Sequence, residues 1–125
     1  MSGSASMGSV ERPAHAGLLT TVADNPDDNK FEASVDGQVV GWQPYRRYQT
    51  HIVLTHTEVD PSWREHGISS AMIDGVLALI RSAGATVVPY CKLTADYILR
   101  HPEYRELVPD QYQTLLRPIS RPGIR

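Results

Sequence analysis

The sequence predicts an α+β domain with a mixed, mostly antiparallel sheet. Three observations support this class. Short runs rich in β-branched residues fill much of residues 18–59, and turn-forming residues separate them. An apolar pattern with helical periodicity begins at Ile68, and a helix of this kind must be covered by a sheet. Another β-branched run at residues 85–90 completes a strand, helix and strand, an order that pairs the two strands in parallel.

The two ends of the chain look less regular than the part between them. Residues 1–17 are rich in serine, glycine and alanine and have no apolar period, so we expect a flexible leader there. Residues 18–108 carry the strand and helix patterns and are expected to form a single domain. Residues 109–125 contain three prolines and are expected to form an irregular tail.

The first half of this domain is expected to be a set of antiparallel strands. Strands are predicted at residues 18–23, 31–35 and 39–48. Asn, Asp and Pro over residues 24–29 predict a turn after the first strand. Asp36-Gly37 is a dipeptide that tolerates a tight hairpin turn between the next two. Gly41 and Pro44 would weaken a central strand, so we expect a bend or bulge near them.

Residues 51–59 are predicted to form one continuous strand. Regular alternation along it would place His56 and Glu58 on the same side. The helix that follows has a wide apolar stripe and a narrow polar face made of Ser70, Asp74 and Arg81. The apolar stripe contains Ile68, Ala71, Met72, Ile73, Gly75, Val76, Leu77, Leu79 and Ile80.

The second half closes with a strand and a short helix. Ser82-Ala83-Gly84 is expected to stop the long helix, and the strand at residues 85–90 follows. A second helix is predicted over residues 93–99, ending before the His101-Pro102 pair because a residue that precedes proline is pushed out of helical space.

Composition excludes several classes of function. A chain of 125 residues with 41% hydrophobic residues fits one modest core. A net charge of −2 and a sequence pI near 6.2 argue against a nucleic-acid footprint. The apolar runs are too short to span a membrane and the start lacks a signal-peptide layout, so a cytoplasmic protein is expected. One cysteine excludes an internal disulfide, and the sequence shows no zinc signature or other metal site.

The turn between residues 59 and 71 is the most informative motif. It joins a strand to the start of the long helix, where backbone N–H groups lack intrahelical partners and the helix dipole is positive. Such a turn can bind a diphosphate. The spacing Arg64-x-x-Gly67-x-Ser69 resembles the acyl-CoA loop of the GNAT N-acetyltransferases, although Ser69 stands where Gly or Ala is usual. A plain turn is the competing interpretation.

Further motifs carry the same resemblance over roughly residues 18–107. The chain resembles the small YjdJ-type branch of the GNAT N-acetyltransferases. The motifs are Thr55-His56-Thr57-Glu58-Val59-Asp60-Pro61, Val88-Pro89-Tyr90-Cys91 and Tyr97-Ile98-Leu99-Arg100-His101-Pro102-Glu103-Tyr104.

The resemblance implies a fold in which two neighbouring parallel strands, here residues 51–59 and 85–90, splay apart and hold acetyl-CoA between them. Backbone groups of the first strand would pair with the pantetheine amides, and the turn would hold the diphosphate. Arg64 and His66 are either auxiliary phosphate contacts or solvated surface residues. The cofactor-binding residues implied are Thr57, Val59, Arg64, Glu65, His66, Gly67, Ile68, Ser69 and Ser70.

Acetyl transfer to an amine needs a base for the amine and a proton for the departing thiolate. Glu58 or His56 would act as the base, or the two as a base and its orienting partner. Cys91 precedes a helix and Lys92, both of which would favour a thiolate able to accept the acetyl group. Tyr97 resembles the tyrosine that protonates the CoA thiolate. Each of these residues also has a structural reading, as a paired carboxylate, a core histidine, a buried thiol or a packing ring.

Three functions therefore compete: an acetyltransferase acting on an amine of a small molecule or a protein, a non-catalytic acyl-CoA sensor, and an interaction domain that uses the sheet as a scaffold. Lys92 and Ser69 depart from the family pattern, so acceptor geometry can differ. Larger relatives wall the acceptor site with helices between their first two strands, which this sequence lacks, so we expect an open acceptor cleft. The strand at residues 39–48 is expected to offer a sheet edge on which a homodimer could form.

Overall fold

The computed structural model describes residues 5–116 and has the α+β architecture that the sequence predicts. Its seven-stranded sheet has the order β1-β2-β3-β4-β5-β7, and β6 pairs separately with β4. The strands are β1 (Ser9–Pro13), β2 (Leu19–Asn25), β3 (Lys30–Val35), β4 (Gln38–Tyr48), β5 (His51–Leu54), β6 (Glu58–Val59) and β7 (Thr86–Pro89). All pairs are antiparallel except β5 with β7.

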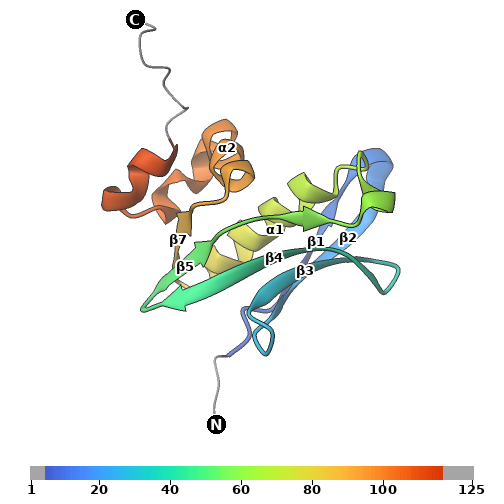
Figure 1. Ribbon diagram of the computed structural model, residues 1–125, viewed down its shortest axis with the longest axis horizontal. Coiled ribbons are helices and arrows are strands. Elements are labelled where there is room, and N and C mark those ends of the chain that lie inside the picture. The colour runs from blue at the N-terminus through green and yellow to red at the C-terminus, as the bar shows by residue number, and fades with distance from the viewer. Residues whose placement is uncertain (1–4, 117–125) are drawn as a thin grey trace, which may run out of the picture.

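Two α-helices and four short 3₁₀ segments complete the fold. They are η1 (His15–Gly17), η2 (Pro61–Trp63), α1 (Ile68–Ser82), α2 (Lys92–Arg100), η3 (Pro102–Leu107) and η4 (Asp110–Leu116). The curled sheet wraps around α1, which packs most closely against β1 and β2 and also contacts β3, β4, β6 and β7 (Figure 1). The second helix and the 3₁₀ segments after it gather beside α1 at the β7 edge.

The segment that was expected to be a flexible leader contains the N-terminal strand β1. It pairs along its whole length with β2, from Ser9 opposite Ala23 to Pro13 opposite Leu19. The buried Met7 just before it donates its N–H to Asp24 Oδ2 at 2.8 Å. The expectation of a flexible leader is therefore wrong for residues 7–17, while residues 1–4 lie outside the described part of the chain.

The predicted hairpin between β3 and β4 is confirmed. Asp36 and Gly37 form its turn with φ of 52° and 81°, the left-handed pair that matches strand twist in a two-residue turn. The ladder between the two strands shifts register once, which leaves Val40 as the extra residue of a bulge beside Gly41. The expected irregularity near Gly41 is therefore present.

Helix α1 buries the stripe that the sequence predicts, and all nine apolar residues of that stripe are buried. Gly75 allows β2 to approach this helix closely. A Cβ built on Gly75 would lie 2.8 Å from Val22 Cβ. The polar face at Asp74 remains half-buried because β1 and α2 lie on either side of it.

Residues 51–59 do not form the single strand that was expected. Pairing with β4 stops after Leu54 and resumes at Glu58, so the segment is divided into β5 and β6. Strand β4 itself lies inside the sheet, paired with β3 on one side and with β5 and β6 on the other. It therefore offers no free edge, and the basis of the expected homodimer is wrong.

The end of the chain is more ordered than a loose tail. The second predicted helix is confirmed as α2, and η3 and η4 pack beyond it. Tyr104, Val108 and Leu116 are buried, with Leu116 only 1% exposed. The irregular tail expected over residues 109–125 is therefore wrong up to Leu116, and residues 117–125 lie outside the described part.

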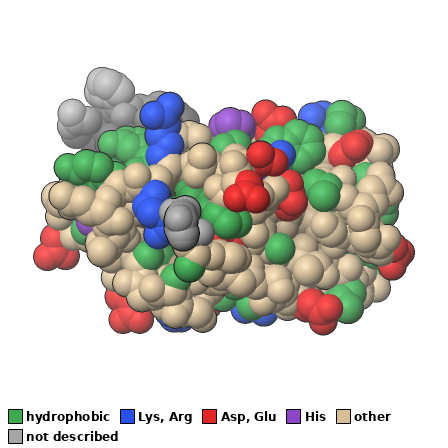
Figure 2. All heavy atoms as spheres, turned by 90° about the horizontal axis from the view of Figure 1, so that it is seen from below, with side chains coloured by type: hydrophobic (Ala, Val, Ile, Leu, Met, Phe, Trp, Pro, Cys, Tyr) green, Lys and Arg blue, Asp and Glu red, His purple; other side chains and the backbone are tan. Residues whose placement is uncertain are grey.

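Within residues 5–116, none of the helices combines the length and apolar character needed to cross a membrane. On the face drawn in Figure 2, acidic and basic side chains form small separate groups instead of one basic patch. This distribution agrees with the small net charge and gives no support to nucleic-acid binding on that face.

The contact between α1 and β2 gives a first prediction. Replacing Gly75 with Ala should lower the free energy of unfolding by about 1–3 kcal/mol, because the new methyl group would overlap Val22. Helix propensity alone predicts the opposite, a gain of about 1 kcal/mol. Urea unfolding of Gly75→Ala beside Ser82→Ala, an exposed control in the same helix, measures the difference. A stabilised Gly75→Ala protein would show that β2 does not approach α1 this closely.

Candidate functional site

The candidate site lies at a break in the ladder that β4 forms with β5 and β6, opposite Pro44. Tyr45 donates its N–H to Asn29 on the β3 side, so the nitrogen of Pro44 faces β5 and β6 and has no hydrogen to donate. Two residues of β4, at positions 43 and 44, lie opposite the three unpaired residues 55–57. The extra residue bends the second strand and frees residues 55–57 from the ladder.

The parallel strands β5 and β7 separate at this break, as the resemblance implied. Their ladder ends at Leu54 opposite Pro89, and Cys91 adds one more hydrogen bond from its N–H to the Leu54 carbonyl at 2.9 Å. Beyond this bond the two segments diverge: the first continues along β4 as β6, and the second enters α2. We call the opening between β6 and the start of α2 the fork. Thr57 Oγ1 and Cys91 Sγ lie 3.2 Å apart across this fork. The only cysteine of the sequence therefore lies at the apex of the V between these two segments.

Cys91 is buried at the start of α2, and its side chain does not cap the helix. The Lys92 ammonium, expected to support a Cys91 thiolate, instead pairs with Asp96 at 3.0 Å on the helix surface. The structure thus gives Cys91 the Thr57 hydroxyl as its polar neighbour.

His56 and Glu58 lie together, as predicted, on the outer side of the break. His56 Nε2 is 3.4 Å from Glu58 Oε2, and each side chain is 52% exposed. Their proximity results from the bend at residues 55–57 and not from the regular strand that was expected. An exposed histidine paired with a carboxylate can accept a proton from a substrate amine in solution.

One cavity joins this strand to the start of α1. It has a volume of about 310 Å³ and is lined by Thr57, Glu58, Val59, Arg64 and Ser69. Gly67 occupies the helix N-cap with φ of 78°, and within the described part of the chain no side chain caps the first turn. The first N–H groups of α1 therefore have no intrahelical or side-chain acceptor, which suits them to an anion.

The turn before α1 is held by its own contacts. Asp60 accepts hydrogen bonds from Ser62 Oγ at 2.6 Å and from Ser62 N–H at 2.9 Å, and these bonds lower the pKa of the Asp60 carboxyl. Glu65 adopts a left-handed φ of 67°, and the His66 ring packs on Trp63. This geometry presents Arg64, Glu65 and His66 at the surface.

The other predicted cofactor residues divide between the two sides of α1. Ile68 is buried in the core, so only its backbone can reach a ligand. Gly67 and Ser70 line a second cavity on the β1 side of the helix, and Tyr97 lines that cavity too. Eight of the predicted site residues therefore line one or the other of two cavities that share the start of α1. The residues that line neither cavity are His56, Glu65, His66, Ile68 and Cys91.

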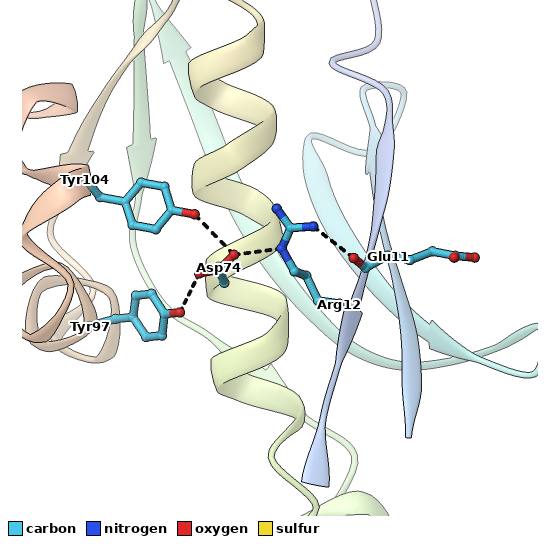
Figure 3. Close-up of polar contacts among 5 residues, drawn as sticks. All are labelled: Glu11, Arg12, Asp74, Tyr97 and Tyr104. Carbon is cyan, nitrogen blue, oxygen red and sulfur yellow. Dashed lines mark hydrogen bonds and ion pairs between the residues drawn. The ribbon is translucent and has the colours of Figure 1, made fainter. Parts of the chain in front are cut away.

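Tyr97 takes part in a polar cluster around Asp74 (Figure 3). The Asp74 carboxylate accepts hydrogen bonds from Arg12 Nε at 2.7 Å, from the Tyr97 hydroxyl at 2.6 Å and from the Tyr104 hydroxyl at 3.1 Å. These donors come from β1, α2 and η3, so one carboxylate on α1 joins the two ends of the fold. We call these four residues the Asp74 cluster.

The Asp74 cluster changes the protonation of its members. Burial alone would raise the pKa of Asp74, but hydrogen bonds from Tyr97, Arg12 and Tyr104 outweigh it and leave the pKa lowered. Burial and the hydrogen bond to Asp74 raise the pKa of Tyr97. Tyr97 therefore keeps its proton and already donates it to Asp74, which makes it a poor proton source for a thiolate.

A second polar pair lies behind the break. Gln43 is fully buried on β4 and donates from Nε2 to Thr94 Oγ1 at 2.7 Å, three residues after Cys91 in α2. Among the described residues, Gln43 Oε1 is a buried side-chain atom without a hydrogen-bond partner. The pair holds α2 against the strand opposite the fork.

Sequence reasoning missed Arg12, His15 and Asp74. Arg12 and His15 fall in the segment assigned to the leader, where Val10 is the only apolar residue of β1 and gives no pattern. Asp74 was seen only as part of a polar helix face. A single acidic residue within a long apolar helix was the available signal, because such a charge usually has a partner.

Comparison with known proteins places this geometry in a family. Residues 30–107 match the family model described as GCN5-related N-acetyl-transferase. No curated protein matches the chain. The matched region includes the fork, the turn before α1 and Asp74, and it ends at Leu107, the last residue of η3. Strand β1 and η1 lie outside it.

The Asp74 cluster gives a second prediction. Replacing Asp74 with Asn should lower the free energy of unfolding by about 2 kcal/mol, because Asn removes a charge that three donors surround. The folded-state pKa is lowered, so this contribution is complete above the unfolded value of about 3.9 and is lost as the pH falls through the folded-state pKa. Urea unfolding of both proteins over this pH range measures it.

The matched control is Asp96→Asn, which removes a half-exposed carboxylate of α2 that pairs with Lys92 alone among residues 5–116. It should change the free energy of unfolding by no more than about 0.5 kcal/mol. An Asp74→Asn effect as small as that of the control, or one that persists unchanged at pH 2, would contradict a stabilising carboxylate at this position.

Proposed function

Because the chain belongs to the GCN5-related N-acetyltransferase family, we propose that it transfers the acetyl group of acetyl-CoA to an amine of a small molecule or a protein. The observation that carries this proposal is the fork between β6 and α2. There an open cavity, an uncapped helix start, a buried thiol and an exposed His–Glu pair lie next to one another.

The residues around the fork fit acetyl-CoA. The pantetheine arm would lie along Thr57 and Val59 in the cavity, and the uncapped N–H groups at the start of α1 would receive the diphosphate. Arg64 lines the same cavity and adds a positive charge. Bound acetyl-CoA would supply the thioester carbonyl that the amine attacks.

Glu58 and His56 are proposed to accept the proton of the amine. Their exposure lets an amine approach from solvent, and their ion pair orients the imidazole. Two routes remain for the acetyl group. In direct transfer the amine displaces the CoA sulfur. In a relay, Cys91 Sγ forms a new thioester while the CoA sulfur leaves with the thiol proton, and the amine then displaces Sγ, which regains a proton.

A second candidate function is a non-catalytic acyl-CoA-binding or sensing module. The observation that favours it is the hydrogen bond from Tyr97 to Asp74, which occupies the proton expected for the CoA thiolate. If the protein is an acetyltransferase, Tyr97 is a structural donor within the Asp74 cluster. The leaving thiolate then takes its proton from Cys91 or from water.

We further propose that the chain belongs to the small YjdJ-type branch of the family. The His-Thr-Glu-Val segment and Cys91 support this placement, because the first spans the end of the break and β6 and the second lies at the apex of the fork.

Cofactor binding is tested by changing the sign of the charge at the start of α1. Ser69→Asp should weaken acetyl-CoA binding by more than about tenfold, because its carboxylate would repel a diphosphate. Ser69→Asn, similar in size but neutral, should weaken binding much less. An acidic residue in the first turn favours the helix, so Ser69→Asp should remain folded. Calorimetric titration measures the affinities. Equal binding by both variants would exclude the start of α1 as the diphosphate site.

Turnover is tested with acetyl-CoA and a panel of amines, following the release of CoA thiol. Glu58→Gln and His56→Ala should each lower kcat by about 100-fold, while acetyl-CoA affinity stays within a factor of about 3. Glu106→Gln, an exposed change in η3, is the control that should leave kcat unaltered. Binding without turnover by the wild-type protein would select the sensing module.

The route of transfer is decided at Cys91. If the relay operates, mass spectrometry of the wild-type protein with acetyl-CoA alone should find one acetyl group on Cys91, and Cys91→Ala should abolish turnover. Unchanged turnover by Cys91→Ala, with no acetylated protein, would select direct transfer.

A further inference from the structure

The second cavity at the start of α1 is walled by the N-terminal segment that sequence reasoning had assigned to the leader. It has a volume of about 360 Å³, and Arg12, His15, Gly67, Ser70, Asp74 and Tyr97 line it. The first cavity contains Ser69 and the second contains its neighbour Ser70. The two cavities therefore lie on either side of the same uncapped first turn.

His15 is docked on the turn before α1. Its backbone N–H donates to the His66 carbonyl at 2.9 Å, and its Nδ1 lies 3.3 Å from the Glu65 carbonyl. The ring also covers Gly67, where an added Cβ would come within 2.5 Å of it. These contacts fix the imidazole over the helix start even though the residue is exposed.

The contact with Glu65 determines what the imidazole can do. A carbonyl oxygen only accepts, so Nδ1 must carry the hydrogen of this bond. Nε2 is then left as the free nitrogen, and it lies over Gly67, closer than 3 Å to a Cβ built there. When protonated, the ring keeps its bond to Glu65 and gains an N–H donor at Nε2, which is the form that binds a phosphate.

The charged groups that line the second cavity largely balance one another. Arg12 and Asp74 neutralise each other in the same cavity, and Tyr97 stays a neutral donor to Asp74. The side chains of Glu65 and His66 belong to the turn itself and are exposed. The positive end of α1 then favours an anion next to His15.

We propose that His15 is a cofactor-binding residue that contacts a phosphate at the nucleotide end of acyl-CoA, and that the second cavity receives this end. The inference rests on the proposed function. The pantetheine arm would occupy the first cavity, the diphosphate would cross the first turn of α1, and the adenosine phosphate would reach His15. A segment outside the matched residues 30–107 thereby completes the cofactor site.

Two substitutions separate a ligand contact from a role in holding the turn. His15→Asn keeps a donor at the position of Nδ1, so the bond to Glu65 is retained, but it removes the group at Nε2. His15→Gln places an amide N–H at the position of Nε2 and gives up the one at Nδ1. Calorimetry with acetyl-CoA, adenosine 3′,5′-bisphosphate and S-acetyl-pantetheine compares both with the wild-type full chain.

We expect His15→Asn to weaken binding of acetyl-CoA and of adenosine 3′,5′-bisphosphate by about tenfold, and His15→Gln to restore most of the loss. Binding of S-acetyl-pantetheine, which has no nucleotide, should be equal in all three proteins. In the wild-type protein, NMR of the imidazole nitrogens should show a hydrogen on Nδ1 with and without ligand, and a change at Nε2 when adenosine 3′,5′-bisphosphate binds.

Two results would overturn the inference and leave the proposed function standing. One is wild-type binding of acetyl-CoA that His15→Asn does not weaken. The other is a loss with His15→Gln but not with His15→Asn, because that order follows the turn contact and not the ligand contact. If the folded wild-type protein binds no acetyl-CoA, the proposed function and the inference both fail.

Discussion

The missing N–H of Pro44 is the constraint on which the site depends. A continuous strand opposite β4 would bury residues 55–57 in the ladder and carry the chain past Cys91 without a gap. Because the nitrogen at Pro44 cannot donate, the second strand bulges and re-forms as β6. Gly41 then lets β6 approach, since a Cβ there would lie 3.0 Å from the Glu58 carbonyl. The fork, the Thr57–Cys91 contact and the His56–Glu58 pair all follow from this interruption.

The Asp74 cluster solves a different problem, which is how the two ends of the chain are held to the core helix. A half-buried carboxylate is costly unless donors surround it, and Arg12, Tyr97 and Tyr104 supply three. The same contacts keep β1 and η3 against α1 from opposite sides (Figure 3). Tyr97 therefore has a structural role, because its hydroxyl already donates its proton to Asp74. A tyrosine at a familiar position in the sequence therefore does not by itself establish an acid in the site.

Much of the fold could be predicted because its signals are local. The stripe of α1 repeats with the helical period, and Asp36-Gly37 encodes its own turn, so both were correct. Strand β1 escaped because Val10 is its only apolar residue and its order comes from pairing with β2. The break at residues 55–57 escaped because its cause is Pro44, a residue on another strand. In the candidate site, the residues around Thr57 and Arg64 were predicted from a motif, and Thr57 and Arg64 line one cavity. Arg12, His15 and Asp74 come to one cavity only in three dimensions, and no local pattern in the sequence brings them together.

The connection between the first two strands bears most directly on how this protein would differ from larger relatives. In those enzymes, the resemblance implies, helices at this position wall the acceptor site. Here the connection is residues 14–18, and its single turn η1 docks on the turn before α1 through His15. It therefore lies beside the proposed cofactor site. His56 and Glu58 remain exposed at the other end of the fork. In the proposed reaction the amine would therefore reach His56 and Glu58 from solvent, and within residues 5–116 no helix between β1 and β2 other than the short η1 would stand beside it.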